Sequence, residues 1–325
     1  MEITLPTGRR TTRLGFGCAF PRSVTKSDVA RYLDAAFDAG IRHFDVAPMY
    51  ADGTAEGYLG NFLKSHIDRV TVTTKYGILP SVMRPLHVQV ALKMLGPLLR
   101  TVRRVPAVAS GLSRTASAMN VSSKAAFNAP EAKLSLMRSL EELQLDMVDM
   151  FLMHEPGVSD LGEDLLEFLK DSVALQRVDA FGIAGNASRA SDLYQKRRSF
   201  CDIMQLDWTV FSPKSDYPGS FRIHFSVFSR QLRDVHQALV DRPDLRKRWS
   251  AETDLNLADL GTLSDVMLKG ALSRPPSIVL FRSSKPDNII RNVSVAENTR
   301  LEKNALRFCE LVEQEGAELL VTLPK

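Results

Sequence analysis

Four side chains that can move protons lie at or just after the ends of short, β-rich segments of this sequence. Asp45 lies in HFDVA and Tyr50 shortly after it, Lys75 lies in VTVTTKY, and His154 ends MVDMFLMH. Together, an acid, a phenol, an amine and an imidazole can form one site that transfers a proton to or from a substrate oxygen. Such a site requires these segments to end at the same edge of one sheet.

The chemistry assigns a different task to each group. Tyr50 is the natural proton donor, but a free phenol with a pKa of about 10 is a weak acid at neutral pH. A nearby Lys75 ammonium is expected to favour the phenolate and lower that pKa. Asp45 can pair with Lys75 and keep it charged, and His154 can donate a hydrogen bond to a carbonyl oxygen.

Each of these residues also has a structural explanation when it is considered alone. An Asp near a strand end is often a turn or cap residue, and a single His after an apolar run is often a core residue. The combination is harder to explain by packing. Asp45, Lys75 and His154 buried together would cost stability unless they are paired. Their joint placement therefore favours a catalytic site.

The surrounding sequence alternates between two kinds of pattern. Eight β-rich, mostly apolar segments are typical of strands buried on both faces of a parallel sheet, at 13–19, 43–47, 70–76, 147–154, 178–185, 202–208, 222–228 and 277–283. Amphipathic stretches predict helices at 29–40, 54–65, 130–144, 164–176 and 190–198. We therefore expect an α/β fold of the (β/α)8 TIM barrel class, with residues 1–325 forming a single domain.

Three further segments refine this expectation. Residues 3–14 predict an N-terminal β-hairpin that turns at Thr7-Gly8. Residues 77–130 form a long insertion after the third strand, and residues 212–221 form a loop rich in Pro, Ser and Gly. Both segments are predicted to fold over the site as lids, although a partly disordered surface excursion is the alternative for the first. An open dinucleotide-binding sheet is disfavoured, because GFGCAF has only the first two glycines of the G-x-G-x-x-G turn.

Composition excludes several classes of protein. The chain has 325 residues, 44% of them hydrophobic, which is enough for a large core. Its three cysteines, at positions 18, 201 and 309, form neither a disulfide framework nor a metal motif. We see no signal-peptide run and no apolar stretch that could span a bilayer, so a cytoplasmic protein without stable membrane insertion is expected. No His-x-His or carboxylate cluster is visible, and no metal is expected.

The positive charge of the chain is concentrated in one segment. The formal net charge of +4 is too small to indicate nucleic-acid binding. Residues 81–130, however, carry seven basic residues and no Asp or Glu, at Arg84, Lys93, Arg100, Arg103, Arg104, Arg114 and Lys124. This segment is expected to cover the substrate pocket and to favour bulky or anionic carbonyl compounds. It could instead dock on an acidic partner or on a membrane surface, and the identity of a protein partner is left open.

Taken together, the motifs resemble those of the aldo-keto reductase family. The segment AGIRHFDVAPMYADGTAEGYLG is similar to that family's first signature, and TTKYG and VDMFLMHEP follow in the family order. The resemblance runs from residue 13 to about residue 296. It implies that Asp45, Tyr50, Lys75 and His154 are the catalytic residues. It also implies NADP(H)- or NAD(H)-dependent interconversion of an aldehyde or ketone and an alcohol, without a metal.

The resemblance also suggests a cofactor site. It implies that Gln205 bonds the nicotinamide carboxamide, that Phe225 replaces a Tyr stacked on the nicotinamide, and that Ser226 donates to the pyrophosphate. The family's usual Ser-Asn pair corresponds to Ala184-Gly185 here.

The segment FRSSKPDNIIRNV resembles the family's adenosine-phosphate motif. The resemblance implies that Arg282 and Ser283 contact a 2′-phosphate and that Asn292 contacts the adenine. Asn288 and Arg291 stand where the family has Arg and Glu. The implied cofactor is NADP(H), with NAD(H) as the alternative.

Two hypotheses of function follow. The first is a reductase that acts on a small-molecule carbonyl compound. The second is a cofactor-binding regulatory protein with little turnover, resembling potassium-channel β subunits. The altered pair Ala184-Gly185 and the basic insertion motivate the second. Steady NADPH oxidation with a panel of aldehydes would discriminate the two.

Overall fold

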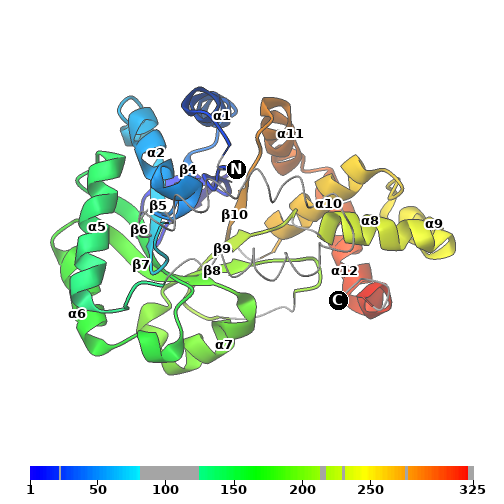
Figure 1. The fold of residues 1–325 in the computed structure, drawn as a ribbon. Coiled ribbons are helices and arrows are strands. Elements are labelled where there is room, and N and C mark those ends of the chain that lie inside the picture. The colour runs from blue at the N-terminus through cyan, green and yellow to red at the C-terminus, as the bar shows by residue number, and fades with distance from the viewer. Residues whose placement is uncertain (22, 81–123, 213–216, 229–230, 275–276, 321–325) are drawn as a thin grey trace, which may run out of the picture.

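Eight parallel strands close into a barrel (Figure 1). The structure is a computed structural model that describes residues 1–21, 23–80, 124–212, 217–228, 231–274 and 277–320. The barrel strands are β3 (Leu14–Gly17), β4 (His43–Asp45), β5 (Thr71–Tyr76), β6 (Val148–His154), β7 (Val178–Gly185), β8 (Ile203–Asp207), β9 (Phe221–Phe225) and β10 (Ser277–Phe281). Each pairs with the next, and β10 pairs with β3 to complete the ring. The predicted (β/α)8 barrel is confirmed.

The helices lie outside the ring of strands (Figure 1). They are α1 (Lys26–Asp38), α2 (Ala55–Leu63), α5 (Ala129–Leu143), α6 (Glu163–Ala174), α7 (Ala187–Lys196), α8 (Gln231–Asp241), α9 (Pro243–Thr253), α10 (Leu260–Leu272), α11 (Pro286–Glu297) and α12 (Leu301–Leu320). Short 3-10 turns are η1 (Tyr50–Gly53), η2 (Ile67–Arg69), η4 (Val158–Asp160) and η5 (Arg198–Phe200). The predicted helices correspond to α1, α2, α5, α6 and α7.

Helix α1 illustrates why these segments adopt their structure. The Thr25 side chain caps it by accepting a hydrogen bond from the Asp28 backbone N–H. Val29, Leu33 and Phe37 are buried along one face of the helix, as their spacing requires. The chain then turns at Gly40, whose φ of +100° suits a residue without a Cβ.

Aliphatic side chains fill the interior of the barrel. The buried cluster consists of Leu5, Met150, Leu152, Ala184, Ile203, Ile223, Ile278 and Leu280. A second, larger cluster packs the outer faces of the strands against the helices. The interior also holds an imidazole, because His43 is fully buried and its Nδ1 lies 2.9 Å from Thr71 Oγ1.

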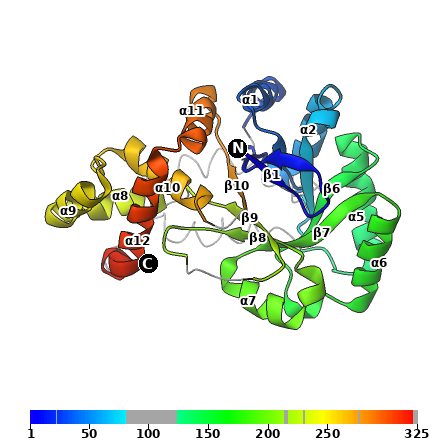
Figure 2. The same cartoon turned by 180° about the vertical axis from the view of Figure 1, so that it is seen from behind.

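The N-terminal hairpin pairs β1 (Glu2–Thr4) with β2 (Arg10–Thr12) in antiparallel register and is visible from behind the barrel (Figure 2). Its predicted turn contains Gly8 at a φ of +86°. Arg9 fastens the hairpin to the barrel, because it donates to Asp149 Oδ1 at 2.6 Å and to the Val70 carbonyl at 2.8 Å. Burial raises the pKa of Asp149 to about 6, although Arg9 opposes that shift.

The predicted insertion follows β5, the third barrel strand. Residues 81–123 lie outside the described residues, so the prediction that they form a lid stays a prediction. The chain returns beside the end of β5, where the Ala125 N–H donates to the Gly77 carbonyl at 2.9 Å.

Of the second predicted lid, residues 212–221, the structure describes residue 212 and residues 217–221. Tyr217 packs against Tyr194 of α7 with ring centroids 5.2 Å apart, and Ser220 donates to the Cys201 carbonyl. Residues 217–221 therefore lead into the N-terminal end of β9. They contribute nothing to the pocket at the opposite end of the barrel.

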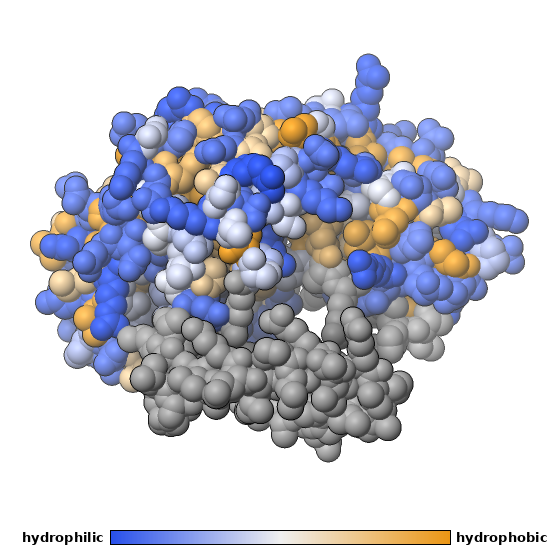
Figure 3. Space-filling view, turned by 45° about the horizontal axis from the view of Figure 1, so that its top comes forward, coloured by the Kyte–Doolittle hydropathy of each residue, from blue (hydrophilic) through white to orange (hydrophobic). Residues whose placement is uncertain are grey.

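The face seen in Figure 3 is largely hydrophilic, with hydrophobic residues scattered over it. In the described part of the chain, no helix combines the length and apolar character needed to cross a membrane. The same residues contain no cluster of His, Cys, Asp or Glu able to hold a metal ion. All three cysteines are buried, and none of them forms a disulfide.

Candidate active site

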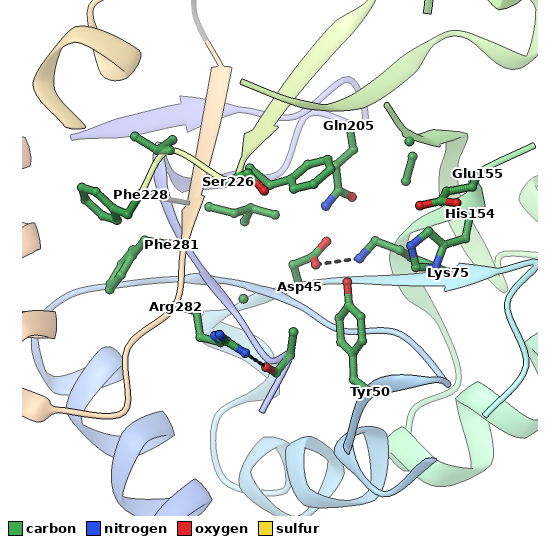
Figure 4. A pocket seen from close by; sticks show the side chains of 17 residues that line it. Asp45, Tyr50, Lys75, His154, Glu155, Gln205, Ser226, Phe228, Phe281 and Arg282 are labelled. Atoms are coloured by element: carbon green, nitrogen blue, oxygen red, sulfur yellow. Dashed lines mark hydrogen bonds and ion pairs between the residues drawn. The ribbon is translucent and has the colours of Figure 1, made fainter. Parts of the chain in front are cut away.

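A pocket of about 390 Å³ opens at the C-terminal ends of the barrel strands (Figure 4). It is lined by Gly17, Ala19, Asp45, Tyr50, Lys75, His154, Glu155, Ala184, Gly185, Gln205, Phe225, Ser226, Val227, Phe228, Leu280, Phe281 and Arg282. The four side chains singled out for proton chemistry therefore line one cavity. Parallel strands bring them together, because all C-terminal strand ends meet at one rim.

Asp45 and Lys75 form a buried ion pair at the base of this pocket. The Lys75 ammonium donates to Asp45 Oδ1 at 2.6 Å and to the Val46 carbonyl at 3.1 Å. The two side chains are only 4% and 1% exposed. Burial opposes the charge on Lys75, but Asp45 and Tyr50 outweigh it and raise the pKa of Lys75. Lys75 is therefore a fixed cation.

Tyr50 points its hydroxyl toward Lys75 (Figure 4). The ammonium lies 5.3 Å from the centre of the Tyr50 ring. We expected Lys75 to lower the pKa of Tyr50, and its effect has that sign. Burial is the larger influence, however, and the net result is a raised pKa. In this pocket Tyr50 is therefore a protonated phenol, able to donate.

His154 faces Tyr50 with the two rings perpendicular and their centroids 6.4 Å apart. Burial, and then the charge of Lys75, lower the pKa of His154 to about 3. The imidazole is consequently neutral at physiological pH. A neutral imidazole can donate one N–H hydrogen bond to a substrate oxygen without bringing a second positive charge into the pocket.

The turn that carries Tyr50 has an unusual backbone. Ala51, Asp52 and Gly53 all have positive φ, at 49°, 57° and 96°. Left-handed backbone is unfavourable for residues with a Cβ, so the surrounding structure must hold the first two in place. The Tyr50 N–H donates to the Ala47 carbonyl at 3.0 Å, which ties this turn to the end of β4.

The opposite wall has features that suit a nicotinamide ring. Gln205 is 3% exposed and its Oε1 has no hydrogen-bond partner, so it can accept from a carboxamide. Phe225 supplies an aromatic face, and Ser226 follows it at a φ of +66°. Ala184 and Gly185 offer no polar side chain. The residues present therefore fit a nicotinamide, although Ala184 and Gly185 supply fewer polar side chains than the Ser-Asn pair of the family.

A second pocket, of about 230 Å³, shares the lining residue Arg282 with the first. It is lined by Phe20, Pro21, Tyr32, Arg282, Ser283, Ser284, Lys285 and Asn288. The Arg282 guanidinium also donates to the Ala19 carbonyl across the mouth (Figure 4).

Two predicted cofactor residues lie outside both pockets. Arg291 of α11 makes two hydrogen bonds to Asp265 of α10, at 3.0 and 2.9 Å, which directs its guanidinium toward that helix. Asn292 is 9% exposed and lines neither cavity.

Conversely, our sequence analysis missed Glu155 and Phe228, which line the first pocket. Glu155 directly follows His154 at a strand end, and that position alone could have identified it.

Comparison with known proteins gives consistent results. The model of the family described as "Aldo/keto reductase family" matches residues 13–215. A D-threo-aldose 1-dehydrogenase from Pseudomonas sp is 31% identical over 191 residues, which cover 55% of this chain and 50% of that protein. The chain spans between about a fifth and a half of the length of the curated relatives it matches.

Solved structures share the fold. The aldo-keto reductase AKR11C1 from Bacillus halodurans, in its holo form, is 16% identical with a TM-score of 0.69, covering 94% of this chain and 95% of that one. An aldo-keto reductase from Klebsiella pneumoniae in complex with NADPH is 16% identical with a TM-score of 0.65, covering 96% of each chain.

Proposed function

Because this chain belongs to the aldo-keto reductase family, we propose that it is a nicotinamide-dependent oxidoreductase that interconverts an aldehyde or ketone and the corresponding alcohol. The observation that carries the proposal is the single pocket lined by Asp45, Tyr50, Lys75 and His154. Barrel enzymes keep their active sites at this end of the barrel.

In the proposed reaction the chain's own residues handle the proton. The bound reduced cofactor supplies a hydride to the carbonyl carbon. Tyr50, which keeps its proton at neutral pH, donates it to the carbonyl oxygen as negative charge develops there. Lys75, held by Asp45, then stabilises the phenolate. The neutral His154 donates a hydrogen bond to the same carbonyl oxygen and orients it.

The test of this mechanism is the variant Tyr50→Phe. It should lower turnover by about 10²- to 10⁴-fold, because it removes only the acid–base hydroxyl. Affinity for NADPH, measured by fluorescence titration, should stay within about twofold of wild type, because the ring remains. Tyr58→Phe, on the adjacent helix α2, is the matched control and should keep full turnover. Turnover by Tyr50→Phe at the wild-type rate would contradict the assignment.

For the cofactor we propose NADP(H), with NAD(H) as the alternative. Arg282, Lys285 and Ser283 in the second pocket supply two cations and a hydroxyl, a set suited to a 2′-phosphate. The relative from Klebsiella pneumoniae described in complex with NADPH supports the same choice. The variant Lys285→Met should weaken NADPH binding and leave NADH binding nearly unchanged. Equal affinity of the wild-type protein for NADPH and NADH would argue against a phosphate subsite.

For the substrate we propose a small carbonyl compound. The curated relative named D-threo-aldose 1-dehydrogenase makes aldoses a sensible part of the test panel, beside simple aldehydes and ketones.

A cofactor-binding regulator is the second candidate, and one observation favours it. Ala184 and Gly185 leave the nicotinamide end of the pocket with fewer polar side chains. Tight NADPH binding by the wild-type protein, with no NADPH consumed in the presence of any panel compound, would support this role over the enzyme.

A further inference from the structure

Glu155 is a pocket residue for which the proposed proton transfer has no use. It lies beside His154 at one end of the pocket (Figure 4). Its φ of 55° is in the left-handed region, which is unfavourable for a residue with a Cβ. Strained residues of this kind concentrate at functional sites, so Glu155 is a candidate for a role of its own.

The backbone of Glu155 is held on two sides. Its N–H donates to the Ala184 carbonyl at 2.6 Å, and the Lys124 ammonium donates to its carbonyl at 2.8 Å. Gly185 lies against the same residue. A Cβ built on Gly185 would be 3.6 Å from the Glu155 Cα and 4.0 Å from its Cγ. The Glu155 side chain therefore starts beside a wall position that has no side chain.

The charges that line the pocket are distributed unevenly. Asp45 and Lys75 neutralise each other, and His154 is neutral. Among the described residues of this lining, Glu155 is then the negative charge at one end and Arg282 the positive charge at the other (Figure 4).

Lys124 is the cation nearest to Glu155 in these contacts, but it bonds to the main-chain oxygen. Within the described ranges, no Lys or Arg pairs with the Glu155 carboxylate. Lys124 therefore reduces the field of the carboxylate without cancelling it.

This distribution complements a nicotinamide dinucleotide in one orientation. The anionic pyrophosphate suits the Arg282 end, and the nicotinamide suits the part of the pocket lined by Gln205 and Phe225, with Glu155 at the end beyond it. The oxidised ring carries a positive charge and the reduced ring is neutral. A carboxylate near the ring stabilises the oxidised form by direct attraction, which the neutral form does not experience.

We propose that Glu155 is a tuning residue that strengthens binding of the oxidised cofactor relative to the reduced one. The inference rests on the proposed function, because it requires the nicotinamide to bind at this end of the pocket. Its consequence would be a lower reduction potential of the bound cofactor, which favours hydride transfer to the carbonyl compound relative to the same pocket without the carboxylate.

The experiment measures the dissociation constants of NADP⁺ and NADPH separately, by fluorescence titration of the full chain. Glu155→Gln keeps the shape of the side chain and removes its charge. Because Glu155 is exposed, the loss of its charge should weaken NADP⁺ binding about three- to fivefold, the size of a solvent-screened charge pair, and change NADPH binding less than about twofold. Glu167→Gln, on the exposed face of α6, removes one remote negative charge and should change neither constant.

Glu155→Gly provides a second variant, because glycine adopts positive φ without strain. It should fold at least as well as Glu155→Gln and lose the same preference for NADP⁺. Equal weakening of both cofactor forms, or no change in either, would overturn the tuning role while leaving the proposed function intact. Failure of the wild-type protein to bind either form would instead overturn the proposed function, and the inference with it.

Discussion

Replacing Lys75 with Met should convert Asp45 into a buried acid without its cation, with Gln205 as the remaining side chain that favours its charged form. The Asp45 side chain is 4% exposed, and in the intact protein its Oδ1 accepts from Lys75 at 2.6 Å while its Oδ2 has no partner. Without the ammonium, the carboxylate keeps its desolvation cost and loses its main compensation. Removing one partner of a buried pair typically costs about 3–5 kcal/mol in free energy of unfolding.

The size of this loss should depend on pH. Burial already raises the pKa of Asp45 in the presence of Lys75, and the variant should raise it further. When the pKa of an acid is higher in the folded protein than in the unfolded one, its contribution to stability is complete below the unfolded pKa, about 4. That contribution is lost as the pH rises toward the folded pKa. Between these two pKa values, the free energy of unfolding of Lys75→Met should fall by about 1.4 kcal/mol per pH unit.

Urea denaturation at pH 5 and pH 8 measures this directly. The comparison protein is the double variant Asp45→Asn/Lys75→Met, in which neither position can ionise, so the stability difference between the two variants should grow from pH 5 to pH 8. A difference that is the same at both pH values would refute the account of Asp45 as a desolvated acid held charged by Lys75. So would a double variant as unstable as the single one at pH 8.

Three further predictions concern other parts of the molecule. Arg9→Met should lower the free energy of unfolding in urea by about 1–3 kcal/mol, because it leaves Asp149 buried without its ion-pair partner, although Arg9 itself is 35% exposed. The control Arg10→Met removes an exposed ion pair and should lower it by less than about 1 kcal/mol. Gly60→Ala should lower the free energy of unfolding by about 1–3 kcal/mol, because the new Cβ would overlap main-chain atoms at the C-terminal end of α5; unchanged stability would mean that α2 and α5 can separate freely. An NMR titration of His154 should give a pKa of about 3. The contribution of the neutral ring to stability is therefore complete above about pH 6.5 and is lost as the pH falls toward 3. A titration midpoint near 6.5 would show that the ring is not desolvated.

The strand pattern in the sequence predicted the barrel and the meeting of Asp45, Tyr50, Lys75 and His154 at one rim. This was feasible because nearly continuous apolar runs and their ends are local features, and parallel strands bring their C-terminal ends together wherever the intervening helices lie.

The amphipathic pattern did not predict helices α8 to α12, and the burial of α9 and α10 explains why for those two. Helix α10 is buried on nearly every side, so its sequence lacks a clear polar face. Helix α9 buries only Trp249 and Thr253, so it lacks an apolar one. Periodicity identifies a helix when one face is buried and the other exposed, and neither helix meets that condition.

The electrostatics of the site were decided by tertiary structure alone. The types of residue indicated that Lys75 acts on Tyr50, but only the depth of the pocket made desolvation the larger influence on its pKa. In the same way, the sequence placed Arg291 in the adenosine-phosphate motif, and the packing of α11 on α10 directs its guanidinium to Asp265 instead. The sequence by itself determined which groups stand at the strand ends. Their charges and partners depend on distances between segments remote in the chain, which only the folded structure determines.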